Sequence, residues 1–233
     1  MRKIWISVAI LVMISVRTVV LVPSALSADF QTWADIATIH RFGDKWRYDG
    51  DQGIRGLVSQ NDFTTLYFRP SVRYRIKPWF TVHGGIRFFQ TLNRESENYF
   101  ELGPWQGLRF TWPQLGKYAV SHYFRLEERM IWQTTGKNVF DFSLRGRYQL
   151  GVRSPNYDIL FKNGLYLTGS AELFWNLDDS LLENFVNRVR IDFGAGTKVS
   201  EAWRVELHYV LQDGRSIEED LFQNPFDSEE HIL

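Results

Sequence analysis

Two places in this sequence bring together side chains that are able to catalyse reactions. Glu206 and His208 are two residues apart, so on a β-strand both point to the same face, and a carboxylate beside a histidine can orient a general base. Ser121 and His122 are adjacent, which puts them on opposite faces of a strand and excludes a nucleophile–base pair. An ordinary ion-pair network, joined by Arg204, explains Glu206 and His208 more simply than a hydrolase does.

Other signatures of enzymes and cofactor sites are missing from the sequence. It contains no cysteine, which excludes disulfides and thiolate metal ligands, and its histidines and acids lack metal-ligand spacing. It has no glycine-rich phosphate loop and no Gly-x-Ser-x-Gly turn. The formal net charge is +0, so the composition gives no sign of a basic nucleic-acid surface. We expect no enzymatic activity, no cofactor, no metal and no nucleic-acid partner.

Arginine at alternating positions is the strongest chemical feature of the chain. Arg145 and Arg147, like Arg188 and Arg190, are separated by one uncharged residue, so each pair shares a face of a strand. We predict that this face lines the lumen, meaning the interior of a closed barrel. The predicted lumen residues are Arg73, Arg75, Arg87, Arg125, Glu127, Arg129, Arg145, Arg147, Glu172, Arg188, Arg190, Arg204, Glu206 and His208, and Arg69, Arg109, Asp141 and Asp192 have the same parity.

The elements that must carry these residues are strands, because the dominant period of the chain is two. Phe140 and Phe142, for example, share one face while Arg145 and Arg147 share the other. Aromatic residues make up 16% of the chain although its mean hydropathy is −0.27, which fits alternating apolar and polar positions. Strands are predicted at Gln31–Phe42, Trp46–Ser59, Thr64–Lys77, Trp79–Thr91, Pro104–Trp112, Tyr118–Trp132, Asn138–Val152, Leu165–Leu177, Asn184–Val199 and Trp203–Gln212.

Strand length and connections favour a transmembrane barrel. Strands of about ten residues cross a bilayer when tilted, and they must close on themselves there. Short turns such as Gly43-Asp44 alternate with longer polar loops such as Leu92–Tyr99, as in outer-membrane barrels. Tryptophans near strand ends suggest interfacial girdles: Trp33, Trp46, Trp79, Trp112, Trp132, Trp175 and Trp203. We therefore predict an all-β fold, a single antiparallel up-and-down transmembrane barrel of about 10–12 strands.

The same alternation allows a competing interpretation. A soluble periplasmic β-barrel would turn its apolar face inward, bind an apolar ligand and expose its arginines to water. Strand length, strand number and the terminal tryptophans favour the membrane barrel. In that barrel the inward arginines either pair with acids and fill the lumen, or they line a narrow water-filled path that leans toward anions. Both are favoured over a wide diffusion pore.

The N-terminal region has the features of a secretory signal peptide. Arg2 and Lys3 precede the apolar run Ile4–Val16, Pro23 breaks the segment, and small residues follow at Ala25–Ala28. A retained membrane anchor is the alternative, but Arg17 interrupts the apolar run. We predict a signal peptide at residues 1–28 and an outer-membrane barrel domain at residues 29–233.

Several strand patterns resemble a family of uncharacterised bacterial outer-membrane β-barrel proteins, the domain of unknown function 2490. The resemblance covers most of the mature chain and rests on loose patterns, namely Arg69–Tyr74, Gly84–Arg87, Trp105-Gln106, Arg125–Arg129, Glu172–Asn176 and Asn187–Arg190 with Gly194. It implies a Gram-negative outer-membrane barrel, with outer-membrane lipid and the barrel-assembly machinery as partners. It implies no catalytic or binding residue. Members usually continue after a segment like His231-Ile232-Leu233, so we expect the final strand to be incomplete.

Overall fold

The computed structural model describes residues 10–21, 30–57, 63–94, 96–113, 116–136, 139–158, 164–177, 188–200 and 203–214. Within these ranges the chain forms strands β1 (Ile10–Leu21), β2 (Phe30–Phe42), β3 (Trp46–Leu57), β4 (Phe63–Arg69), β5 (Ser71–Lys77), β6 (Phe80–Asn93), β7 (Tyr99–Thr111), β8 (Ala119–Gln133), β9 (Phe140–Arg153), β10 (Leu165–Asn176), β11 (Arg188–Lys198) and β12 (Trp203–Gly214). The all-β prediction is confirmed. A helix long and apolar enough to cross a membrane does not occur in these ranges.

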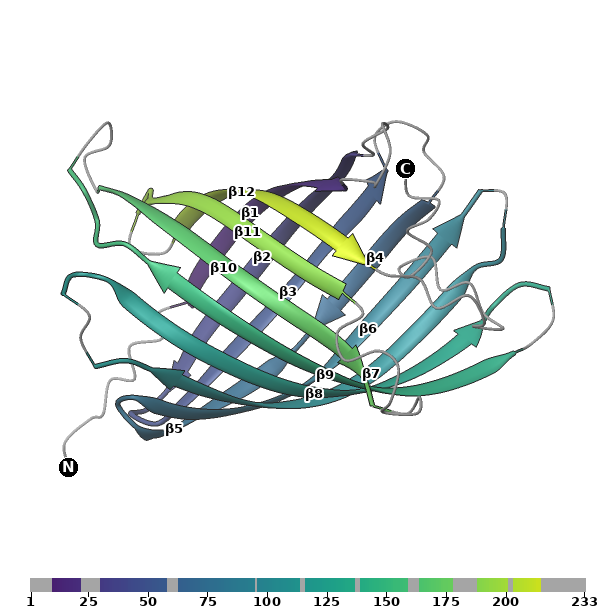
Figure 1. Ribbon diagram of the computed structural model, residues 1–233, viewed down its shortest axis with the longest axis horizontal. Helices are drawn as coiled ribbons and strands as arrows, with labels where there is room; N and C mark the ends of the chain where they lie inside the picture. The colour runs from purple at the N-terminus through teal and green to yellow at the C-terminus, as the bar shows by residue number, and fades with distance from the viewer. Residues whose placement is uncertain are drawn as a thin grey trace, which may run out of the picture.

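The strands form one sheet whose hydrogen-bonded order returns to its start. From β2 it passes through β3 and the pair β4 and β5 to β6, and then follows chain order to β12. β12 pairs with β1, and β1 pairs with β2. Figure 1 shows the tilted strands arranged around a common interior, with β12 beside β1. Between β2 and β12 the sheet is antiparallel, as predicted, whereas β1 and β12 are parallel.

All ten predicted strands form, and prolines explain the two clearest differences. Pro70 lacks a backbone N–H, and it divides the predicted strand Thr64–Lys77 into β4 and β5, which both pair with β6. β7 begins at Tyr99 rather than at Pro104. Pro104 lies inside β7, opposite Ile86 of β6, and the ladder from β7 to β8 is interrupted there. Pro104, which the sequence predicted as the first residue of a strand, is therefore an internal strand residue.

β1 occupies residues that the sequence analysis assigned to the signal peptide. In the uncleaved chain it runs antiparallel to β2, from Ile10 opposite His40 to Val20 opposite Phe30. The prediction of cleavage concerns processing, which the fold of the whole chain leaves untested. The predicted cleavage region at Ala25–Ala28 and the C-terminal segment His231–Leu233 lie outside the described residues.

The two faces of the sheet have opposite chemistry. Strands β2 to β12 all place large apolar side chains on the outer face, with exposed fractions between 36% and 62%. Buried side chains on the inner face include Thr65, Glu101 and Glu127. A soluble barrel with an apolar core requires the reverse arrangement. Among strand residues whose side chains are described, Glu128 is the charged residue that interrupts the outer face, and it is exposed.

Of the tryptophans predicted to mark the ends of the outer face, all but Trp33 are at least partly exposed. Trp46, Trp79 and Trp112 lie at the short-turn end and are 51%, 45% and 52% exposed. The prediction for Trp33 is wrong, because its side chain points inward and is only 6% exposed. It lies under two guanidinium groups, with its ring centroid 5.4 Å from Cζ of Arg55.

Candidate functional site

The strand register brings the predicted lumen charges into direct cross-strand pairs. Glu127 of β8 lies opposite Arg145 of β9, and Glu172 of β10 lies opposite Arg190 of β11. Directly opposed residues have Cβ atoms about 4.5–5.5 Å apart, so long charged side chains meet easily. The alternation seen in the sequence therefore becomes a continuous charged lining.

Four arginines surround Glu127 at the middle of this lining. The Glu127 carboxylate is 0% exposed, and its oxygens lie 2.6 Å from Arg87 Nη1, 2.6 Å from Arg125 Nε, 2.7 Å from Arg145 Nη2 and 2.7 Å from Arg147 Nη1. These five residues are called the Glu127 cluster below. A buried carboxylate is stable only when it is paired and hydrogen-bonded, and here both oxygens accept bonds from guanidinium groups.

Two further carboxylates extend the Glu127 cluster toward both sides of the barrel. Glu101 lies 2.5 Å from Arg87 Nη2 and 3.2 Å from Arg129 Nε. Glu172 accepts a hydrogen bond of 2.6 Å from Arg147 Nη2, and it lies 3.5 Å from Arg190. Strands β6 to β11 are thus joined through their inner faces by one ion-pair network.

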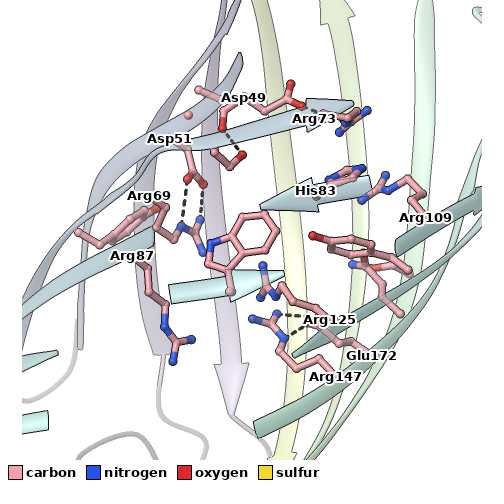
Figure 2. A pocket seen from close by; sticks show the side chains of 18 of the residues that line it. Asp49, Asp51, Arg69, Arg73, His83, Arg87, Arg109, Arg125, Arg147 and Glu172 are labelled. Carbon is pink, nitrogen blue, oxygen red and sulfur yellow. Dashed lines mark hydrogen bonds and ion pairs between the residues drawn. The ribbon is translucent and has the colours of Figure 1, made fainter. Parts of the chain in front are cut away.

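A second group of ion pairs lies on β3, β4 and β5. Asp51 accepts two bonds from the guanidinium of Arg69, which also stacks over the ring of Tyr67. Asp49 lies 2.7 Å from Arg47 Nε and 3.0 Å from Arg73 Nε, so one carboxylate serves two cations. Figure 2 shows Asp49 and Asp51 on one wall and Arg125, Arg147 and Glu172 on the other.

Between these groups the lumen contains a cavity of about 430 Å³. Five carboxylates line it, from Asp49, Asp51, Glu101, Glu172 and Asp192. Eleven arginines line it, at positions 47, 55, 69, 73, 87, 109, 125, 129, 145, 147 and 190. Glu127, buried behind the lining, pairs with four of these arginines, so the eleven arginines exceed the five lining carboxylates and Glu127 by five positive charges. Such a cavity attracts anions and repels cations.

A comparison with protein families identifies the family to which the chain belongs. A family model described as protein of unknown function (DUF2490) matches residues 30–223. The chain belongs to the DUF2490 family. The resemblance inferred from the strand patterns is confirmed, and the matched region contains all the lumen residues described above. No curated protein and no solved structure is significantly similar to this DUF2490 chain.

Most predicted lumen residues of the DUF2490 chain line the cavity or the Glu127 cluster. Arg75 does not line the cavity: its side chain is exposed and its guanidinium donates to the carbonyl oxygen of Asp44 in the turn after β2. Arg204 lies opposite Lys198 near the short-turn end and does not line the cavity either. Arg188 begins β11, and its side chain lies outside the described residues.

Glu206 and His208 form a small network of their own on β12. His208 Nδ1 is 2.7 Å from an oxygen of Asp192, and His208 Nε2 is 3.1 Å from an oxygen of Glu206. The phenol of Tyr166 donates to the other oxygen of Glu206. Both imidazole nitrogens therefore face carboxylates, and the arrangement directs neither of them toward a substrate. Among the described residues, no group of three or more His, Cys, Asp or Glu side chains is placed to hold a metal ion.

The charged cavity residues of two strands, β3 and β7, were not among the predicted lumen residues, apart from Arg109. Arg47, Asp49 and Asp51 alternate along β3, and that parity was available in the sequence. Glu101 lies between the predicted loop Leu92–Tyr99 and the predicted strand start at Pro104, so it was assigned to no strand, whereas β7 begins at Tyr99. For Glu101 the available signal was the alternation of Phe100 and Leu102 with it, continuing the pattern of β7 upstream of the proline.

Proposed function

We propose that this DUF2490 protein is an outer-membrane β-barrel whose lumen forms a narrow path that favours anions. Support for the membrane comes from the outer face, because eleven successive strands expose apolar side chains to the surroundings. A continuous apolar surface of this size is stable in lipid and promotes aggregation in water. The soluble, ligand-binding alternative needs the apolar face inside and has no support from this arrangement.

Support for the anion preference comes from the charge of the cavity. Eleven arginines against the five lining carboxylates and the buried Glu127 leave an excess of positive charge that these ion pairs do not neutralise. Rings of basic side chains favour anions in pores. The path is narrow because long guanidinium side chains and the Glu127 cluster occupy much of the interior.

Planar-bilayer conductance tests the channel. The purified full chain is inserted between asymmetric KCl solutions, and the reversal potential is expected to have the sign of chloride preference. Arg73→Gln should lower that preference, because it removes a cavity cation while Arg47 still pairs with Asp49. Arg75→Gln on the same strand is the matched control and should behave as the wild type. Cation preference of the wild type would contradict the proposal.

A barrel with a closed, purely structural lumen is the second candidate. The observation in its favour is the complete burial of Glu127 among four arginines, because in this candidate that cluster fills the middle of the lumen and leaves no path through it. Folded, heat-modifiable protein that gives no conductance steps in the bilayer would select this candidate over the channel.

Cell fractionation and mass spectrometry test location and processing. We expect the protein in the outer membrane, inserted with the barrel-assembly machinery, and a mature N-terminus near residue 28. Release in the soluble periplasmic fraction without detergent would contradict the location. An intact N-terminus on the folded protein would contradict the signal peptide and would favour a retained β1.

A further inference from the structure

Arg109 differs from the other cavity arginines in its partners. It lies near the end of β7, it lines the cavity, and no carboxylate of the described residues pairs with it. Its Nε atom is buried and has no hydrogen-bond partner. The guanidinium plane is held from one side, with Cζ 4.6 Å from the ring centroid of Tyr123. The half-buried guanidinium thus faces the cavity with a desolvated Nε and no carboxylate beside it, and an anion bound in the cavity would stabilise its charge.

The side chains around Arg109 come from three neighbouring strands. Arg109 lies opposite Tyr123 on β8 and opposite Thr81 on β6. His83 follows two residues after Thr81, its Nε2 is 2.9 Å from the Thr81 hydroxyl, and its ring centroid is 5.1 Å from that of Tyr123. Arg73 of β5 lies opposite His83. Figure 2 shows the ends of Arg73, His83 and Arg109 gathered at one corner of the pocket.

The charges at this corner do not balance. Arg47, Arg73 and Arg109 bring three positive charges, and Asp49 is the carboxylate that pairs with the first two. The next arginine, Arg125, is already paired with Glu127 at 2.6 Å. The corner therefore retains an excess of two positive charges beside an open cavity.

We propose that Arg73, His83, Arg109 and Tyr123, named the Arg109 site, bind a small doubly charged oxyanion of the phosphate type. Guanidinium groups present forked N–H donors that match the oxygens of an oxyanion, and Arg73 and Arg109 reach the corner from different strands. An anion with two negative charges neutralises the local excess of two positive charges, whereas a monovalent anion neutralises only half of it. This inference names a ligand class for the proposed anion-favouring lumen. It rests on the proposed function in one respect, because water and ions must reach the lumen.

Binding of inorganic phosphate to the full chain, folded in detergent micelles, tests the site. Isothermal titration calorimetry should show saturable binding with one phosphate per chain. Arg109→Gln should weaken binding by about ten- to hundredfold, the loss of one charge-assisted contact. This variant leaves no carboxylate unpaired, so it is expected to fold, and heat-modifiable migration on gels verifies that it does. Arg75→Gln is the matched control and should retain wild-type affinity.

Acetate and chloride serve as comparison ligands, and both should bind more weakly than phosphate because each carries a single charge. Absence of saturable phosphate binding, or equal affinity in the wild type and the folded Arg109→Gln variant, would overturn the Arg109 site. The two proposals fail separately. Anion-selective conductance without phosphate binding would leave the channel standing and remove the site, whereas phosphate binding without conductance would do the reverse.

Discussion

Glu127 and Glu128 are adjacent acids on β8 that face opposite sides of the barrel wall. The same substitution, made at each position in a separate variant, therefore tests which face is inner and which is outer. Glu127 is buried among four arginines of the lumen. Glu128 is exposed on the apolar outer face. Changing each to glutamine removes a charge and preserves the size of the side chain.

The loss of stability expected for Glu127→Gln depends on whether the four arginines around Glu127 have other carboxylate partners. Arg87 also pairs with Glu101, and Arg147 also pairs with Glu172. Arg125 and Arg145 pair with no other carboxylate in the described part of the chain. The substitution therefore leaves two largely buried cations without a counter-charge. Removing one partner of a buried ion pair costs about 3–5 kcal/mol, and we expect a loss of stability in this range.

Glu128→Gln should have a small effect of the opposite sign. A basic residue on the lipid face at the bilayer midplane destabilises a barrel by roughly 2–4 kcal/mol, and an acidic residue does so by less. Neutralising Glu128 should therefore raise the free energy of unfolding by up to about 1 kcal/mol. Urea unfolding in phosphatidylcholine vesicles, followed by tryptophan fluorescence, measures both variants against the wild type. Equal losses for the two variants, or a larger loss for Glu128→Gln, would refute the assignment of inner and outer faces.

Three further changes test the packing and the chemistry of the lumen. Gly103→Ala would place its Cβ against the side chain of Arg87 and should cost about 1–3 kcal/mol in the same urea assay. The matched Gly84→Ala should stay near the wild type, because its Cβ meets only the Trp105 carbonyl oxygen, at an ordinary contact distance of 3.9 Å. Equal costs would contradict the close contact at Gly103. Tyr67→Phe removes the 3.1 Å hydrogen bond to Asp35 and should cost about 1–2 kcal/mol, so an unchanged unfolding midpoint would show that this bond adds no stability. Neither the wild type nor His208→Ala should hydrolyse lipids or peptides above background. Measurable turnover by the wild type that His208→Ala abolishes would establish an enzyme.

Strand positions and face parity could be predicted from the sequence because they depend on a local period. β9, where Phe140 and Phe142 face outward and Arg145 and Arg147 face inward, follows the alternation directly. β7 was predicted only in its second half, because a proline normally ends or edges a strand. Trp33 was assigned to the wrong surface because its position near a strand end was given more weight than its parity.

The partners within the lumen could not be predicted, because they depend on register between strands. Arg87 donates to Glu127 across 40 positions of sequence, and one step of slip between strands would separate them. The lone position of Arg109 is a property of the same register. Parity says that Arg109 points inward, but only the pairing of β6, β7 and β8 shows that no carboxylate lies beside it.

The parallel pairing of β1 with β12 has a consequence for the shape of the mature protein. Because β1 is antiparallel to β2 and parallel to β12, β2 and β12 run in opposite directions. Loss of a leader that contains β1 would leave β2 and β12 as free edges. These two strands are antiparallel to one another, as the other neighbouring strands are, so they could pair directly. Counting β4 and β5 as one crossing, β2 to β12 then supply an even number of crossings, ten in all. A ring with one strand fewer has a smaller circumference. Export would thereby bring the same arginines closer together and raise the positive potential that an entering anion meets.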